Sequence, residues 1–380
     1  MLSPQYRPIV GGYERAAERL SLELVARGHR VTVISERRKK SWAVKENIEG
    51  VCIQRLWCVH VPHFHTLTAS ISLALFLLTE GRRFDIWHVH QFGFHAALAI
   101  AIGKILNRPV VLKITSSADS GLARNTAASR FASFTAAHLK RVTAIVALTR
   151  ETVTEALAFG IPAERVHCLG NGVDTATFLP KNELERSKIR QKLGVGNYRT
   201  VIFVGRLSKE KNPDGLLHAW TKASSALPSD WKLVIVGDGP MRSELQAILE
   251  ERSLERSVLF SGLQDNIEQW MGCADIYVIT SHSEGLSNTL LEAMASGLPV
   301  VATRVSGVTE LVEESGSGLV VEVGDMDGLS LALVTLASDS ELRGRLGVSA
   351  RKVTEQRYAI EIVTDRHEAL YRRLLAESLI

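Results

Sequence analysis

The sequence predicts an α/β protein made of two units, each with a parallel sheet covered by helices. Short β-branched runs alternate with stretches of helical periodicity, a pattern typical of βαβ units. The pattern occurs twice along 380 residues, a length at which two globular domains are expected. With 46% hydrophobic and 23% charged residues, the composition is that of a folded protein rather than of a disordered chain or a coiled coil.

The first half opens with a helix instead of a strand. One face of the predicted helix 13–27 is apolar and consists of Ala16, Ala17, Leu20 and Leu24. The strands predicted after it are Arg30–Ser35, Phe84–His88, Pro109–Ile114, Thr143–Leu148 and Val166–Leu169. The first parallel strand expected before this helix is nearly absent, and a start that is truncated or misassigned would explain this.

The second half repeats the alternation. Its predicted strands are Thr200–Gly205, Trp231–Gly237, Val258–Phe260, Ile276–Thr280, Pro299–Ala302 and Gly318–Val321. Between 178 and 198 the apolar pattern weakens in a charged stretch, which predicts domains at residues 1–178 and 179–357. The last segment, 358–380, is predicted to be a helix that is free to pack elsewhere.

Composition narrows the function classes. The four cysteines form no Cys-x-x-Cys pair and no secretory signal is visible, so a reducing cytoplasm is expected rather than a disulfide framework or a zinc ribbon. No apolar run reaches the roughly 18–20 residues that cross a bilayer. Residues 1–180 carry 22 Lys and Arg against 13 Asp and Glu, whereas the remainder carries 23 against 28. A basic half can attract anionic lipid, nucleic acid or an acidic substrate, or it can serve solubility alone.

Ligands of open parallel sheets bind at the carboxyl ends of the strands, and two loops there carry suitable residues. After the strand that ends at Gly205, Arg206 and Lys211 could both reach one diphosphate, and Gly205 would permit close backbone approach. The alternative is two solvated cations in an exposed turn. A second turn, Gly237–Pro240, joins a strand to a helix at the same edge, although such a sequence also makes an ordinary tight turn.

The strongest local pattern is the segment 283–297. Glu284 lies in the loop after a strand, Ser287 to Thr289 can cap a helix, and Glu292 lies in that helix. The backbone amides of Gly285 and Leu286 and the helix dipole would favour phosphate, while the two carboxylates could accept hydrogen bonds from sugar and ribose hydroxyls. Ordinary surface glutamates on a helix are the alternative.

These residues together resemble the retaining GT-B glycosyltransferases of family four. The resemblance covers nearly the whole chain in the right order. In the second half it rests on the Glu284/Glu292 pair, the Gly205-Arg206 to Lys211 loop, Val236–Pro240 and Gly297–Val301. In the first half it rests on Gly11-Gly12 before a helix, Arg27–His29, Phe84–Ile86 leading to His88–His90, and Asn171–Asp174 before Phe178.

The resemblance implies a GT-B fold of two facing Rossmann-like domains, with the last helix crossing back to the first domain. It implies that Arg206 and Lys211 bind the donor diphosphate, that Glu292 holds the ribose and that Glu284 contacts the transferred sugar. The amides of Gly285 and Leu286 would lie nearby. The remaining donor-binding positions would be Gly205 and Gly237 in the second domain and Gly11 and Gly12 in the first. No metal or other cofactor is expected, because two fixed cations can stabilise the charge on a departing diphosphate.

The sequence departs from the family at two places. Many relatives have a histidine over the transferred sugar, where this chain has Thr115 or one of its neighbours, and a hydroxyl cannot replace an imidazole in proton transfer. The segment Val305-Ser306-Gly307 stands where relatives commonly have two glycines, so an extra side chain would alter the sugar pocket.

Three other patterns have simpler explanations. Asp325-Met326-Asp327 is predicted to cap the following helix rather than to bind a metal. His60, His63 and His65 are assigned to an acceptor-facing loop rather than to a zinc site, since no carboxylate or cysteine pair is evident nearby. The basic run Arg37–Lys40 lacks interleaved aromatic residues, so nucleic-acid binding is not expected.

The function that the resemblance implies is transfer of a sugar from a nucleotide-diphosphate sugar to a hydroxyl of a glycan, lipid-linked or small-molecule acceptor, with retention of configuration and without a metal. This implies polysaccharide or glycolipid biosynthesis in the cytoplasm, with peripheral contact to the inner face of an anionic membrane through the basic half. For the stripe Leu67, Ile71, Leu75 and Leu78, burial in the core is favoured over insertion into lipid. The alternatives are a non-catalytic nucleotide-sugar-binding protein and a nucleotide-sugar epimerase on the same scaffold.

Overall fold

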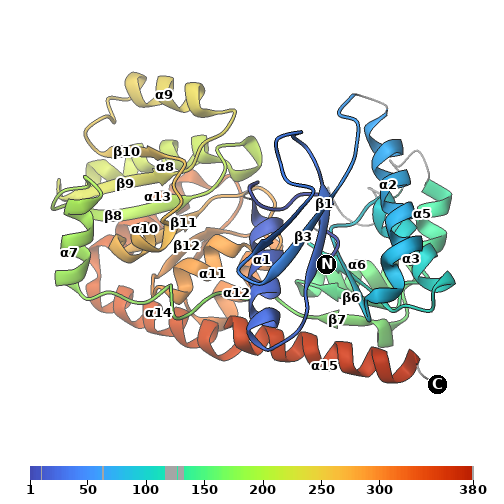
Figure 1. The fold of residues 1–380 in the computed structure, drawn as a ribbon. Helices are drawn as coiled ribbons and strands as arrows, with labels where there is room; N and C mark the ends of the chain where they lie inside the picture. Colours follow the sequence, from blue (N-terminus) through green and yellow to red (C-terminus); the bar gives the residue numbers. More distant parts are fainter. Residues whose placement is uncertain (10, 62–63, 116–125, 127–131, 379–380) are drawn as a thin grey trace. The chain divides into compact units, whose positions relative to one another are not determined.

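The computed structural model describes residues 1–9, 11–61, 64–115, 126 and 132–378. The chain forms two compact units, the first made of Met1–Gly172 and Ile360–Ile380 and the second of Val173–Ala359 (Figure 1). These boundaries lie a few residues from those predicted at 178/179 and 357/358. The C-terminal helix therefore belongs to the first unit.

The first unit alternates helices and strands. Its described α-helices are α1 (Gly12–Ala26), α2 (His65–Glu80), α3 (Phe94–Ile105), α5 (Ala132–Leu139), α6 (Arg150–Ala158) and α15 (Ile360–Ser378). Its described strands are β1 (Thr32–Glu36), β2 (Lys45–Ile48), β3 (Val51–Leu56), β4 (Trp87–His90), β5 (Val110–Ile114), β6 (Ala144–Ala147) and β7 (Val166–Cys168). Strands β4 to β7 form a parallel sheet in chain order, and β1, β3 and β2 form a second sheet.

Leu2 connects the two sheets of the first unit. It forms parallel bridges to Ile34 in β1 and to Val89 in β4, and its backbone amide donates to the His88 carbonyl oxygen at 2.7 Å. A first parallel strand is expected before α1, and the short segment around Leu2 occupies that position.

The β2–β3 hairpin was not predicted. Its two turn residues, Glu49 and Gly50, have φ angles of 52° and 87°, which are the positive values that a tight hairpin turn requires. Asn47 Oδ1 accepts from the Gly50 amide at 3.0 Å and closes the turn. The strand predicted at Phe84–His88 lies further along the chain, because pairing with β5 begins only at Trp87.

Helices α1 and α15 contact each other in the first unit. The predicted apolar face of α1 is confirmed, since Ala16, Ala17, Leu20 and Leu24 are all buried. Arg27, at the end of α1, pairs with Asp365 of α15 at 2.5 Å and donates to the Glu361 carbonyl oxygen at 2.8 Å. Leu370 and Leu374 of α15 pack against Val111 and Val146 of the sheet.

The expectation that the α2 stripe lies in the core is wrong. Leu67, Ile71, Leu75 and Leu78 are between 49% and 60% exposed, and the helix buries Leu73 and Leu77 instead. The helix is apolar on most of its circumference, so helical periodicity alone could not decide which stripe faces inward. An exposed apolar stripe therefore lies on the surface of the first unit.

The second unit has one six-stranded parallel sheet. Its described strands are β8 (Arg199–Val204), β9 (Trp231–Val236), β10 (Val258–Gly262), β11 (Ile276–Ile279), β12 (Val300–Thr303) and β13 (Gly318–Val321). Its described α-helices are α7 (Glu183–Lys192), α8 (Pro213–Ala226), α9 (Arg242–Glu251), α10 (Ile267–Cys273), α11 (Asn288–Ala295), α12 (Ser306–Ser315), α13 (Met326–Ser338) and α14 (Ser340–Val353). The strand order is β10-β9-β8-β11-β12-β13, of which Figure 1 labels β8 to β12.

The sheet of the second unit has a switch point between β8 and β11. The chain proceeds from β8 outward through β9 to β10, returns to β11 beside β8, and then proceeds outward in the opposite direction. Loops that leave adjacent strands in opposite directions open a crevice between them, and ligands of such folds bind there. The two loops at this point are residues 205–212 and 280–287.

Candidate functional site

The two switch-point loops bring Lys211 and Glu284 together. Lys211 Nζ forms an ion pair with Glu284 Oε2, and both side chains are largely buried. Glu284 Oε2 also accepts a hydrogen bond from Ser281 Oγ at 3.0 Å. Lys211 and Glu284 are thus more than 70 positions apart in the chain but lie in one site, where the positive charge of the lysine offsets the negative charge of the carboxylate.

Backbone contacts fix the two loops to each other. Thr280 Oγ1, directly after β11, donates to the carbonyl oxygens of Lys211 at 2.9 Å and Asn212 at 3.0 Å. The His282 amide donates to the Glu210 carbonyl oxygen at 2.8 Å. The positions of Lys211 and Glu284 are therefore held by the fold rather than by their own ion pair alone.

The loop after β8 is also tied to the turn after β9. The Leu207 amide donates to the Asp238 carbonyl oxygen at 3.0 Å. Gly237 has a φ of 139°, and a Cβ on it would lie 1.9 Å from the Gly205 carbonyl oxygen. Any side chain at position 237 would clash with the backbone of Gly205, so only glycine fits this turn.

Glu292 lies in α11, the helix that follows the Glu284 loop, and is only 1% exposed. The helix begins after Ser287, whose hydroxyl accepts from the Leu290 amide, as the sequence predicted. Thr289 Oγ1 is 2.9 Å from the Tyr277 hydroxyl. Burial raises the pKa of Tyr277, and the negative charges of Glu284 and Glu292 raise it further.

Arg206 differs from Lys211. Its side chain is exposed, and within the described part of the chain it has no ion-pair partner. Gly205 and Gly285 are partly exposed, whereas Leu286 is buried. Of the two residues predicted to bind the diphosphate, Lys211 is therefore in an ion pair, whereas Arg206 is in none among the described residues.

The other predicted site residues lie in the first unit. Gly11 precedes α1, and a Cβ on it would lie 2.4 Å from Glu14 Oε2, so the carboxylate of Glu14 needs the space. Gly12, the first residue of α1, is exposed. Thr115 follows β5 directly and is partly buried. The predicted site residues are thus divided between the two units, and the ion pair between Lys211 and Glu284 lies entirely in the second.

The predicted cap of α13 is confirmed for Asp325. Asp325 caps α13 by accepting from the Gly328 amide at 2.8 Å, and Asp327 pairs with Lys222 on the surface. Sequence reasoning missed Thr280 and Ser281, which fix the Glu284 loop. Their position immediately after β11 was the signal that could have identified them.

Comparison with known proteins assigns the chain to a family. Residues 185–353 match the model for glycosyl transferases group 1, and residues 11–172 match the model for the glycosyl transferase 4-like domain. Together these matches cover most of the chain. The chain belongs to the group 1 glycosyltransferases, and the predicted GT-B fold is confirmed by its structural neighbours.

Relatives align with nearly the whole chain or with about half of it. N-acetyl-alpha-D-glucosaminyl L-malate synthase of Bacillus anthracis is 24% identical, with 97% of this chain and 96% of the relative aligned. The 4-alpha-N-acetylgalactosaminyltransferase of Campylobacter jejuni that is named for a diphospho-undecaprenol substrate is 33% identical over 49% of this chain and 48% of the relative. The crystal structure of Anabaena Alr3699/HepE in complex with UDP superimposes with a TM-score of 0.81 at 21% identity, over 98% of both chains.

Proposed function

We propose that the protein transfers a sugar from a nucleoside-diphosphate sugar to a hydroxyl of a glycan, lipid-linked or small-molecule acceptor, with retention of configuration. The observation that carries the proposal is the pairing of Lys211 with Glu284 at the switch point of the second sheet. Cations can bind the diphosphate of such a donor, and carboxylates can accept hydrogen bonds from the hydroxyl groups of its sugar and ribose. The structural neighbour solved with UDP, and the same protein with UDP-glucose, support a donor of this class.

The residues then take separate roles. Arg206 has no ion pair to break among the described residues, so it can meet the diphosphate directly, whereas Lys211 must share its charge between the diphosphate and Glu284. Glu284 would accept hydrogen bonds from the transferred sugar, and Glu292 from the ribose. The two cations stabilise the negative charge that develops on the departing diphosphate.

Incubation with radiolabelled UDP-, GDP- and ADP-sugars tests the activity. Transfer or hydrolysis of one donor is expected, and proton NMR of the product should show the anomeric configuration of the donor. The acceptors offered are water, simple glycosides and polyprenyl-diphosphate glycans. The last are included because the Campylobacter jejuni relative is named for a diphospho-undecaprenol. Tight binding of a donor without turnover would instead identify a nucleotide-sugar-binding protein, and conversion of the sugar on its nucleotide would identify an epimerase.

The transfer is proposed to need no metal at the diphosphate. Protein treated with a chelator is expected to transfer sugar at the same rate with and without added Mn²⁺, because Arg206 and Lys211 supply the positive charge. Transfer that appears only on addition of Mn²⁺ would assign a metal to the reaction and contradict this part of the proposal.

Contact with a membrane surface is proposed for α2. A membrane-spanning helix is absent from the described residues, since none of their helices combines the length and the apolar character that a bilayer requires. The exposed stripe of α2, which consists of Leu67, Ile71, Leu75 and Leu78, ends close to the exposed Arg82 and Arg83. An apolar face beside basic residues is typical of helices that lie in the surface of an anionic membrane.

Leu75→Asp is expected to reduce binding to vesicles that contain anionic lipid by at least tenfold, because a charge on the apolar face cannot enter the lipid. Leu331→Asp, at an equally exposed leucine of α13, is the matched control and should bind as the wild type does. Co-sedimentation at low and high salt measures both contributions. Wild-type binding that Leu75→Asp leaves unchanged, or no binding at either salt concentration, would contradict the proposed contact.

A further inference from the structure

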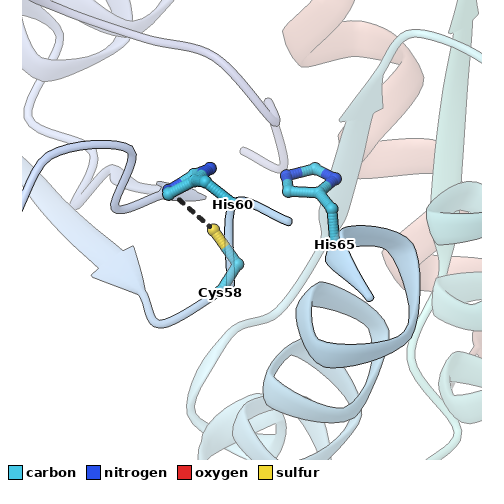
Figure 2. Close-up of side chains that lie close together, drawn as sticks. All are labelled: Cys58, His60 and His65. Carbon is cyan, nitrogen blue, oxygen red and sulfur yellow. Dashed lines mark hydrogen bonds between the residues drawn. The ribbon is translucent and has the colours of Figure 1, made fainter. Parts of the chain in front are cut away.

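Three potential metal ligands gather where β3 leads into α2. Cys58 and His60 lie in the segment after β3, and His65 is the first residue of α2 (Figure 2). One ligand atom from each of the three residues lies within 4.8 Å of the others. The sequence favours an acceptor-facing loop over a zinc site here, because no carboxylate or cysteine pair is evident near the histidines. The structure contradicts the part about the carboxylate, since Glu36 lies beside His65. His63, which was grouped with them, lies outside the described residues.

The spacing of the first two ligands matches tetrahedral coordination. Cys58 Sγ is 3.6 Å from His60 Nε2 (Figure 2). A tetrahedral zinc ion with bonds of about 2.3 Å to sulfur and about 2.0–2.1 Å to nitrogen holds these atoms about 3.6 Å apart. A weak hydrogen bond between thiol and imidazole would explain this pair, but it would not explain why the ring of His65 lies beside them, with its centroid 5.6 Å from that of His60.

A carboxylate supports the third ligand. Glu36, at the end of β1, places Oε2 at 3.2 Å from His65 Nε2. Metal-bound histidines commonly have a carboxylate beside the ring, which orients it and raises its basicity. Arg38 also contacts Glu36, at 3.2 Å, and offsets part of its charge. His60 Nε2 lies 3.2 Å from the Arg37 carbonyl oxygen, at the long end for a hydrogen bond, so a metal could replace that contact at little cost.

The cluster is accessible and leaves room for a further ligand. Cys58 is buried, His65 is partly buried and His60 is exposed, so an ion could enter from the solvent side. Glu36, Cys58 and His65 line a cavity of about 200 Å³ within the first unit. One sulfur and two nitrogen ligands with an open position favour Zn²⁺ over Mg²⁺ or Mn²⁺, which prefer oxygen.

We propose that Cys58, His60 and His65 bind one Zn²⁺ ion, with Glu36 as the carboxylate that supports His65. The ion would join the segment after β3 to the start of α2. The proposed transfer chemistry does not require it, because the residues assigned to the donor diphosphate belong to the second unit.

Titration of chelator-treated full-length protein with Co²⁺ tests the proposal without any donor or acceptor. The wild type is expected to bind one equivalent and to develop the thiolate-to-cobalt charge-transfer band and the intense visible bands of tetrahedral Co²⁺, both of which Zn²⁺ should abolish by displacing it. Cys58→Ser should remove the charge-transfer band. His60→Ala should weaken binding by at least tenfold, and because that side chain is exposed its loss should leave the fold intact.

Glu36→Gln should weaken binding by about 10- to 100-fold without removing the band, as expected for a residue that acts through a ligand. Cys168→Ser is the matched control, since this cysteine is exposed and lies outside the cluster. The proposal is overturned if the wild type shows no charge-transfer band, if the band survives in Cys58→Ser, or if Cys168→Ser removes it. Binding that His60→Ala leaves unchanged also contradicts the proposed ligand set.

Discussion

Replacing Arg206 or Lys211 by alanine is expected to lower kcat/KM for sugar transfer by roughly 10²- to 10³-fold, the usual effect of removing a group that stabilises charge in a transition state. Both side chains lie in the loop after β8, and Lys211 pairs with the carboxylate of Glu284. In the transition state the nucleoside diphosphate departs and negative charge accumulates on its phosphate oxygens. A fixed cation therefore stabilises the transition state more than the ground state. Initial rates at limiting donor concentration measure the effect.

The two variants should differ in stability. Arg206 is exposed and has no ion pair among the described residues, so Arg206→Ala should unfold at the wild-type temperature. Lys211→Ala leaves the largely buried Glu284 with Ser281 as its remaining partner among the described residues, and a loss of about 1–2 kcal/mol is expected for a buried group that has lost its ion pair. Lys209→Ala, an exposed lysine in the same loop, is the control and should keep wild-type rates and stability. If Arg206→Ala and Lys211→Ala both transfer sugar as fast as Lys209→Ala, the loop does not bind the diphosphate.

The carboxylates are expected to act on different parts of the donor. Glu292→Gln should weaken binding of the free nucleoside diphosphate about tenfold, because the ribose loses a charged acceptor. Glutamine is chosen because Glu292 is almost fully buried and alanine would leave a cavity. Glu284→Gln should not weaken that binding, since it frees Lys211 from its ion pair, but it should lower sugar transfer by at least tenfold.

Calorimetric binding of the diphosphate and transfer rates of the intact donor separate these roles. Glu210→Gln, an exposed carboxylate in the loop after β8, controls for the change of charge. Equal losses for the free diphosphate and the sugar donor in both glutamate variants would refute the division of roles.

The fold could be predicted because its signals are local. Most of the described buried strands are short runs rich in β-branched residues, and the helices between them follow the helical period. The order of these elements was enough to indicate two parallel α/β units. The hairpin at Glu49 and Gly50 was missed because its strands are short and its first strand is polar, although glycine in the turn was a usable signal.

The parts that could not be predicted depend on contacts between distant segments. Glu36 reaches His65 across 29 positions of the chain, and no sequence pattern relates the two. Lys211 and Glu284 were predicted to lie in one site, but no sequence pattern indicates that they form an ion pair. In α2 the sequence carries apolar residues on both faces, so only packing against the rest of the first unit decides that Leu73 and Leu77 are buried.

Amide hydrogen exchange with and without a nucleoside diphosphate tests the central claim most directly. Thermal unfolding with UDP, GDP and ADP first identifies the base, since a ligand at about 100 times its dissociation constant stabilises by roughly 2.7 kcal/mol. With that nucleotide bound, slower exchange is expected in residues 205–212 and 280–292, the loops and helix that carry the proposed site. Stabilisation by none of the three nucleotides, or protection that spares both segments, would contradict the assignment of the donor site.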